Sequence, residues 1–285
     1  MKYKIIAIDL DGTLLDHTGL PTPQNIKAIQ DAQDAGVLVL PCTGRAWAES
    51  KMQLRPIANL SQGVFLTGAM ITNIQTDVHI DLAEIHPQLL KDLTDLLFDI
   101  PEALLIFKNA RATGHDYLVT GNGKLTGNTQ WWFDHCQSSA HHQKHLAPDD
   151  YHHAMRVSIV ACQSRMNTLK DLILSHFGDQ VLLHHFPAAA TPQTQQSYHV
   201  LEIFASGIDK FRGINYIASS LNIPPSQIAA IGDQINDSPM IQGAGLGIAM
   251  QNATPAIKKI ARRVTKSNNE SGVAHAIYQM LDGKW

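Results

Sequence analysis

Short runs of wholly apolar residues alternate with helical segments at both ends of this chain, and this alternation most constrains its fold. Ile5–Ile8 and Val37–Leu40 each indicate a strand buried on both faces, because neither run alternates apolar with polar residues. Between them, Thr22 followed by Pro23 predicts the start of a helix, and Gly36 predicts its end. The pattern therefore predicts an α/β fold with a doubly wound parallel sheet.

The pattern changes near residue 80, where a hairpin is expected over Ile71–Ile80. Residues 84–187 then combine helices with strands that do not alternate one for one, which predicts an inserted α+β unit. Pro187–Ser197, rich in Ala, Thr, Gln and Pro, is expected to be a linker, and the first pattern resumes from His199. We therefore expect one domain from residues 1–83 and 188–285 and a second from 84–187.

Composition argues against several classes of partner. A net charge of −3 with 16% charged residues does not provide the excess of positive charge that binds nucleic acid or anionic lipid. The apolar run at the N-terminus is too short for a signal peptide, and no stretch approaches the ~18 apolar residues of a membrane span. The 3 cysteines lack CxxC spacing, so no thiolate zinc site is supported. We expect a cytoplasmic protein that acts on small molecules.

Acidic residues directly follow two of the predicted buried strands. Asp9 and Asp11 come after Ile5–Ile8, and Asp233 comes after Ile228–Ile231. Ligands of open α/β sheets lie outside the carboxyl ends of the strands, so these carboxylates are expected to converge around a cation. Ligation by oxygen alone favours Mg²⁺ over Zn²⁺. Taken by itself, the Asp11-Gly12 step also fits an ordinary turn at a strand exit.

Four short motifs occur in a fixed order along the chain: Asp9-Leu10-Asp11-Gly12-Thr13-Leu14, Thr43-Gly44-Arg45, Lys210, and Gly232-Asp233-Gln234-Ile235-Asn236-Asp237. In this combination the chain resembles the haloacid dehalogenase (HAD) superfamily of phosphatases, and within it the Cof-type subfamily with a C2 (type IIB) cap. The resemblance covers about 1–83 and 188–285. It implies a Rossmann-like catalytic core and an inserted cap that sets substrate specificity.

The resemblance also implies the catalytic roles. Asp9 would be the nucleophile that forms an aspartyl-phosphate, with one oxygen on Mg²⁺. Asp11 would protonate the leaving alkoxide and then deprotonate the attacking water, while its backbone carbonyl rather than its carboxylate binds the metal. Asp233 would be a further metal ligand. The metal site implied is thus Asp9, Asp11 and Asp233.

Further residues are implied to hold phosphate: Leu10, Thr43, Gly44, Lys210 and Asn236. Asp237 would support the site by holding Lys210 or a metal-bound water. Plainer alternatives stay open from the residues alone. Thr43 and Asn236 could each cap a helix, and a lysine such as Lys210 is more often solvated than buried.

The implied function is Mg²⁺-dependent hydrolysis of small phosphorylated metabolites, with sugar phosphates as the expected substrates. A phosphosugar mutase or phosphotransferase would use the same intermediate, and a non-catalytic sensor of phosphorylated ligands is a third alternative. The chain departs from the subfamily at Thr67-Gly68-Ala69, where Asn-Gly-Ala is usual, and at Gln251-Asn252-Ala253, where Gly-Asn-Ala is usual. These departures put in doubt any substrate contact made by that first Asn. The physiological substrate and the oligomeric state are not decided by the sequence.

Overall fold

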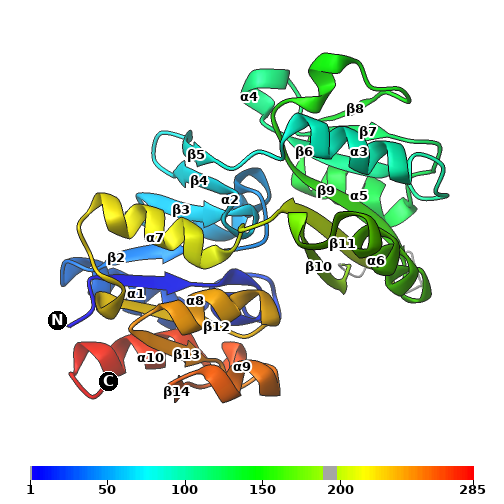
Figure 1. Ribbon diagram of the computed structural model, residues 1–285. Helices are drawn as coiled ribbons and strands as arrows, with labels where there is room; N and C mark the ends of the chain where they lie inside the picture. Colours follow the sequence, from blue (N-terminus) through cyan, green and yellow to red (C-terminus); the bar gives the residue numbers. More distant parts are fainter. Residues whose placement is uncertain (1, 189–197) are drawn as a thin grey trace. The chain divides into compact units, whose positions relative to one another are not determined.

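The computed structural model describes residues 2–188 and 198–285, which form two compact units (Figure 1). The core unit comprises Met1–Leu82 and Asp209–Trp285, and the inserted unit is Ala83–Ile208. Among the described helices, none has the length and apolar character needed to cross a membrane.

The core unit is built around a parallel sheet with the strand order β14-β13-β12-β1-β2 (Figure 1). This order confirms the predicted α/β class. The elements of the unit are β1 (Ile5–Ile8), α1 (Pro23–Asp34), β2 (Leu38–Pro41), α2 (Trp47–Leu54), β3 (Gln62–Phe65), β4 (Met70–Asn73), β5 (Val78–Leu82), α7 (Lys210–Ser220), β12 (Ile228–Gly232), α8 (Ser238–Gly243), β13 (Leu246–Ala249), α9 (Pro255–Ile260), β14 (Arg263–Val264) and α10 (Gly272–Leu281).

Both faces of β1 are buried, as its unbroken apolar run predicts. Ile5 and Ala7 pack in one cluster with Ile214 of α7 and Met240 of α8. Because successive side chains of a strand point to opposite faces, Ile6 lies on the other side of the sheet. The apolar burial on both faces fixes the position of β1 in the middle of the sheet.

The apolar run at residues 63–66 predicts a further strand of the parallel sheet, but the observed strand β3 does not continue that sheet in full. β3 contacts the end of β2 through a single parallel bridge between Cys42 and Val64, and it then pairs antiparallel with β4. β4 pairs in turn with β5, which confirms the predicted hairpin near Gln75 to Asp77. The physical reason is that β3 leads directly into a tight turn, and an antiparallel neighbour needs no crossover helix.

The inserted unit has its own sheet, with the strand order β10-β11-β9-β6-β7-β8. Leucines of α3 and apolar residues of α6 pack together over one face of it, including Leu93, Leu97, Met166 and Ile173. Its elements are α3 (Pro87–Leu97), β6 (Leu104–Lys108), α4 (Ala110–Thr113), β7 (Tyr117–Thr120), α5 (Gly127–Cys136), β8 (Ala140–His142), β9 (Ala154–Cys162), α6 (Gln163–Phe177), β10 (Val181–Pro187) and β11 (Tyr198–Ala205).

The second boundary between the units differs from the sequence expectation. The apolar run at Leu201 and Ile203 was assigned to the core, yet β11 pairs antiparallel with β9 and β10 of the inserted sheet. The chain re-enters the core unit at Asp209 instead of residue 188. A central strand of either sheet is equally apolar, so its pattern alone does not say which sheet it joins. Most of the expected linker, residues 189–197, lies outside the described residues.

Candidate active site

The carboxyl ends of three neighbouring core strands bring the sequence motifs together. Asp9 follows β1, and its backbone N–H donates to the carbonyl of Ile231 in β12 (3.0 Å). The N–H of Cys42, after β2, donates to the carbonyl of Ile8 (2.8 Å). Parallel strands in register therefore place Asp9, Thr43 and Asp233 at one edge of the sheet.

Lys210 is the first residue of α7 and is fully buried, so the solvated alternative for it is wrong. Its Nζ donates to Oδ1 of Asp9 and to Oδ1 of Asp237, at 2.6 Å in both cases. The other oxygen of Asp237 accepts the backbone N–H groups of Asp233 (2.8 Å) and Gln234 (3.0 Å). Asp237 thus fixes both the lysine and the start of the fourth motif.

Asp233 is held against the loop that carries the first motif. Its Oδ1 accepts a hydrogen bond from the hydroxyl of Thr13 (2.8 Å), and its Oδ2 accepts one from the side-chain amide of Gln234 (3.1 Å). Gly12 has φ +76°, and a Cβ there would lie 2.5 Å from Oδ2 of Asp233. Only glycine allows both this backbone conformation and this close approach.

The buried acids carry a surplus of negative charge. Burial, with the neighbouring carboxylate of Asp237, raises the pKa of Asp9 well above its usual value. The same two causes raise the pKa of Asp233 to about 6. Burial opposes the charge of Lys210, but Asp237 and Asp9 outweigh it and raise the pKa of the lysine. Lys210 therefore stays charged and balances one of the three carboxylates.

This donor set fits a divalent cation. One oxygen each from Asp9, Asp233 and Asp237 lies within 4.8 Å of the others. In the described part of the chain, Lys210 is the one basic side chain that is ion-paired with this trio. Three carboxylates against one ammonium leave two negative charges, which a hard divalent ion would neutralise through oxygen ligands. The trio contains Asp9 and Asp233, the two side chains expected to bind the metal, while Asp237 accepts three hydrogen bonds, from Lys210 and from the backbone N–H groups of Asp233 and Gln234.

The side chain of Asp11 is not part of the acidic trio. It is bound by the guanidinium of Arg45, whose Nε and Nη2 donate to its two oxygens at 2.7 and 2.6 Å. The expected contact of Asp11 with the metal was through its backbone carbonyl, and that contact stays a prediction. Arg45 was part of the second motif but had no role assigned from the sequence.

Thr43 is buried and does not lie at a helix end. The N-cap of α2 is Ala46, so the capping alternative for Thr43 is wrong. Its hydroxyl oxygen accepts the backbone N–H of Arg45 (3.1 Å). A Cβ on Gly44 would meet the hydroxyl oxygen of Thr67 at 3.5 Å, an ordinary contact, so the fold does not demand glycine there.

Thr67, at the position of the subfamily's usual Asn, stands out in the structure. It is fully buried, has φ +56°, and follows Leu66 with φ +47°. Its hydroxyl has no hydrogen-bond partner among the described residues. Two successive non-glycine residues in the left-handed region indicate backbone strain, which concentrates at functional sites. The departure from the family motif had drawn attention to this position.

The remaining predicted phosphate ligands lie at the same edge of the sheet. Leu10 is buried at the start of the turn Leu10–Leu14, and Asn236 is half-buried in a 3₁₀ turn, Ile235–Asp237, that precedes α8. Asn236 is not a helix cap, since the residue before α8 is Asp237. Their contacts with phosphate stay predictions.

Asn252 is a residue that sequence reasoning did not assign to the site. Its amide donates to the carbonyl of Gly12 (2.7 Å), and its side-chain oxygen accepts the N–H of Asn268 (3.0 Å). It therefore ties the loop of the first motif to the C-terminal part of the chain. The only sequence signal was its place in Gln251-Asn252-Ala253.

Cys42 precedes Thr43 but is not suited to nucleophilic attack. The thiol is fully buried at the end of β2, and burial holds its pKa well above the usual range. A neutral thiol is a poor nucleophile.

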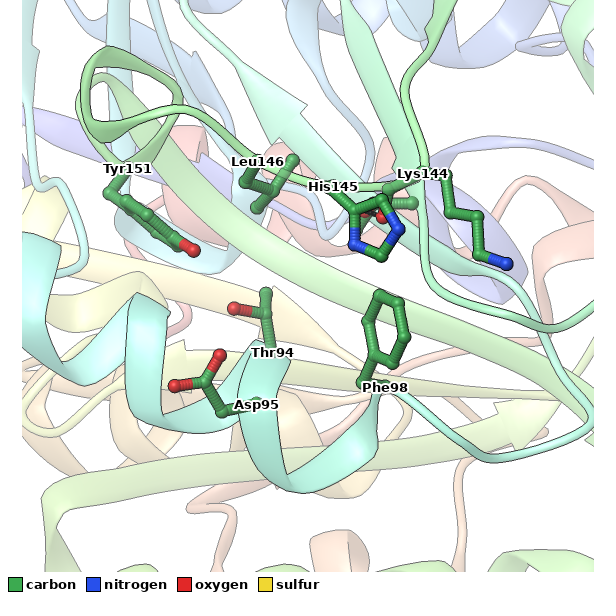
Figure 2. A pocket seen from close by; sticks show the side chains of 8 residues that line it. Thr94, Asp95, Phe98, Lys144, His145, Leu146 and Tyr151 are labelled. Carbon is green, nitrogen blue, oxygen red and sulfur yellow. Dashed lines mark hydrogen bonds between the residues drawn. The ribbon is translucent and has the colours of Figure 1, made fainter.

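The inserted unit contains a separate hollow with a volume of about 250 Å³. Figure 2 shows Thr94 and Asp95 of α3, and Phe98 just after this helix, lining the hollow, with the ring of His145 over Phe98. Those two rings are stacked with centroids 5.2 Å apart. None of the residues of the four motifs lines this hollow.

Comparisons with known proteins agree with this geometry. A family model described as haloacid dehalogenase-like hydrolase matches residues 6–277. The 5-amino-6-(5-phospho-D-ribitylamino)uracil phosphatase YwtE of Bacillus subtilis is 32% identical, and the alignment covers 99% of each chain.

Solved structures show the same fold over nearly the whole chain. A haloacid dehalogenase-like hydrolase from Bacteroides thetaiotaomicron has a TM-score of 0.79 at 20% identity, covering 98% of this chain and 99% of that one. A sugar phosphatase of HAD subclass IIB has a TM-score of 0.74 at 18% identity, covering 97% of this chain and 98% of that one. The chain therefore belongs to the haloacid dehalogenase-like hydrolases, as a Cof-type hydrolase of phosphoric monoesters.

Proposed function

We propose that this enzyme hydrolyses phosphate esters of sugars and sugar alcohols, with Mg²⁺ bound, through a phosphorylated Asp9. The contact of Lys210 with Asp9 carries the proposal. A buried ammonium 2.6 Å from the carboxylate favours the ionised form of Asp9, against burial and the charge of Asp237, which together raise its pKa. An ionised carboxylate at the end of a parallel strand is free to attack an incoming phosphorus atom.

In the first step an oxygen of Asp9 attacks phosphorus, and the bond from phosphorus to the ester oxygen breaks. The leaving alkoxide takes a proton from Asp11, which becomes a carboxylate. Lys210 offsets the negative charge on the transferring group because its Nζ already lies beside Asp9. Asp9 and Asp233 would hold Mg²⁺, which would supply positive charge to neutralise the phosphoryl oxygens.

In the second step a water molecule attacks phosphorus, and the bond from phosphorus to Asp9 breaks. Asp11 accepts the proton of this water, so it returns to the acid form and Asp9 returns to the carboxylate. Inorganic phosphate then leaves. The hydroxyl of Thr43 and the backbone N–H of Leu10 are proposed to bind phosphate oxygens during both steps.

The substrate class rests on two kinds of support. Relatives over the full length include a phosphatase named for a phosphorylated ribitylamino compound, and a structural neighbour is named a sugar phosphatase. Both names describe a phosphate ester of a polyhydroxylated carbon chain. A small, net-acidic chain of charge −3 also suits a compact metabolite better than a polyanion. Location in the cytoplasm stays a prediction.

Trapping the intermediate tests the mechanism. Enzyme and a ³²P-labelled hexose phosphate are mixed with Mg²⁺ and quenched in acid within one turnover, and label on the protein is counted before and after hydroxylamine. We expect hydroxylamine-sensitive label on the wild type and none on Asp9→Asn. Asp11→Asn is expected to form the phosphoprotein slowly or to retain it.

Two outcomes would overturn the proposal. Asp9→Asn that keeps most of the phosphatase activity would rule out this nucleophile. Formation of a phosphate isomer without free phosphate would instead identify a mutase. A parallel assay in EDTA tests the metal requirement, and unchanged turnover there would remove Mg²⁺ from the mechanism.

A further inference from the structure

The ion pair between Arg45 and Asp11 differs from an ordinary surface salt bridge. Two guanidinium nitrogens bind the two oxygens of one carboxylate, at 2.7 and 2.6 Å, in the parallel fork that arginine alone can form. Single-contact surface pairs contribute little to stability, but a bidentate pair fixes the orientation of the carboxylate. The residues are 34 positions apart, so the contact is tertiary.

Arg45 is itself anchored from several directions. Its backbone carbonyl accepts the N–H of Leu66 (2.9 Å), and its N–H donates to the hydroxyl of Thr43 (3.1 Å). It immediately precedes Ala46, whose N–H donates to the carboxylate of Glu49 (2.8 Å) and so fixes the start of α2. Its side chain is 22% exposed, whereas that of Asp11 is 56% exposed. The arginine is the fixed partner, and the aspartate is the one being held.

The backbone around Asp11 explains why it needs such a partner. Asp11 lies in the turn Leu10–Leu14 with φ −72° and ψ 121°, outside helical values, and Gly12 follows with φ +76°. In this turn the Asp11 side chain lies against Arg45, while the side chain of Asp9 lies against Lys210. An exposed carboxylate on a short turn has several rotamers, and proton transfer to a leaving group requires a defined one.

We propose that Arg45 is a positioning residue that holds the Asp11 side chain in the rotamer from which it serves the leaving group: the carboxylate accepts both guanidinium donors, and the protonated form keeps one of these contacts through its other oxygen. The inference rests on the proposed function, because it gives Arg45 a role only through the acid and base work of Asp11. Arg45 does not bind the phosphoryl group in this assignment. Its loss should therefore affect the proton-transfer steps and leave phosphate binding intact.

Leaving groups of different basicity separate these roles. An alkoxide leaving group from a hexose 6-phosphate needs a proton, whereas p-nitrophenolate leaves readily without one. We expect Arg45→Met to lower kcat/KM for the hexose phosphate by about 10²-fold, the lower end of the effect of losing a general acid. For p-nitrophenyl phosphate, kcat/KM should fall by less than about 5-fold, because this leaving group needs no general acid. Arg45→Lys should lie between, since one ammonium cannot form the fork.

A double-mutant cycle with Asp11→Asn tests whether the two residues act as one unit. If Arg45 acts through Asp11, the double variant should be as slow as Asp11→Asn alone, within about 2-fold. Arg55→Met serves as the matched control, because Arg55 is exposed at the C-terminal end of α2, the helix that begins just after Arg45. Thermal unfolding of every variant confirms that each is folded.

The outcomes distinguish this inference from the proposed function. Losses that multiply in the double variant, or equal losses on both substrates, would show that Arg45 binds the phosphoryl group and would overturn the inference. An inactive Asp11→Asn beside a fully active Arg45→Met would overturn it while leaving the proposed function in place. A fully active Asp11→Asn would overturn both.

Discussion

The ammonium group of Lys210 lies between the carboxylates of Asp9 and Asp237, 2.6 Å from an oxygen of each. All three side chains are buried; Asp9 directly follows β1, whereas Asp237 ends the 3₁₀ turn Ile235–Asp237 that follows β12. The lysine therefore serves the stability of the core and the reactivity of Asp9 together.

Replacing Lys210 by methionine should impair both properties. The buried carboxylates lose their counter-ion, which is expected to cost about 3–5 kcal/mol of unfolding free energy. Turnover should fall by about 10²–10³-fold, as when one preorganised electrostatic partner of the transition state is removed. Urea unfolding and steady-state kinetics measure the two effects. Lys27→Met, which removes an exposed pair with Asp31, is the control and should leave turnover unchanged.

Gly12 and Gly19 form a matched pair for testing the approach of the first loop to Asp233. Both have positive φ, +76° and +77°, but a Cβ on Gly19 meets nothing within 4 Å, whereas one on Gly12 lies 2.5 Å from Asp233. Each alanine variant should lose about 1–3 kcal/mol from backbone strain. Only Gly12→Ala should also weaken Mg²⁺ binding, by about 10–100-fold. Equal Mg²⁺ titrations for the two variants would contradict this placement of Asp233.

The raised pKa of Asp233 predicts how pH affects the metal-free protein. Because the folded-state pKa of about 6 exceeds the ordinary 3.8, the folded state binds the proton more tightly than the unfolded state does. The contribution of Asp233 to stability therefore decreases as pH rises from about 4 to 6. Bound Mg²⁺ should reverse the penalty, so the Mg²⁺-induced rise in Tm should be larger at pH 7.5 than at pH 5.

Thermal unfolding of the wild type and of Asp233→Asn, each in EDTA and in Mg²⁺, isolates this effect. The difference between the two proteins in EDTA should shrink as pH falls below 6. An Mg²⁺-induced rise in Tm of the same size at both pH values would contradict the assignment of Asp233 as a ligand.

Arg156 and Glu202 form a buried pair within the inserted unit, with an Nη1 to Oε1 distance of 2.6 Å. Arg156 also donates to the hydroxyl of Tyr117 (2.8 Å). Arg156→Met should destabilise the unit by about 3–5 kcal/mol, because it removes this guanidinium from a buried carboxylate. The double change Arg156→Met with Glu202→Leu should recover much of that loss.

The comparison variant for this pair is Arg165→Met. Arg165 contacts Glu102 at 3.0 Å, and the arginine side chain of this pair is 36% exposed, far more than that of Arg156. Its loss should therefore cost at most about 1 kcal/mol. Hydrogen exchange in the inserted unit, measured beside that of the core unit, locates each effect. A double variant less stable than Arg156→Met would contradict the explanation given for that variant.

The parallel core sheet could be predicted because local sequence determines it. The run Ile5–Ile8 can be buried on both faces only in the middle of a sheet, and the helical segments between such runs supply the crossovers. The position of Asp9 at a strand end follows directly. The convergence with Asp233 follows as well, because parallel strands share their carboxyl edge.

Only the tertiary structure shows that β11 belongs to the inserted unit. Leu201 and Ile203 are as fully buried as the core strands, and nothing in their pattern identifies β9 and β10 as partners. Strand pairing is a contact between distant segments, whereas hydrophobic periodicity records only how each segment is buried. The same reason explains why β3 was expected to run fully in the parallel sheet.

The sequence by itself determined the identity and order of the chemical groups: Asp9 and Asp11 after one strand, Lys210 at a helix start, and Asp233 after another strand. Tertiary structure decided what each group touches. It placed Asp11 on Arg45 and Lys210 between two carboxylates, contacts that span 34, 201 and 27 residues. The physical reason is that a hydrogen bond needs its two atoms about 3 Å apart, and only the packed fold brings residues so distant in the chain that close.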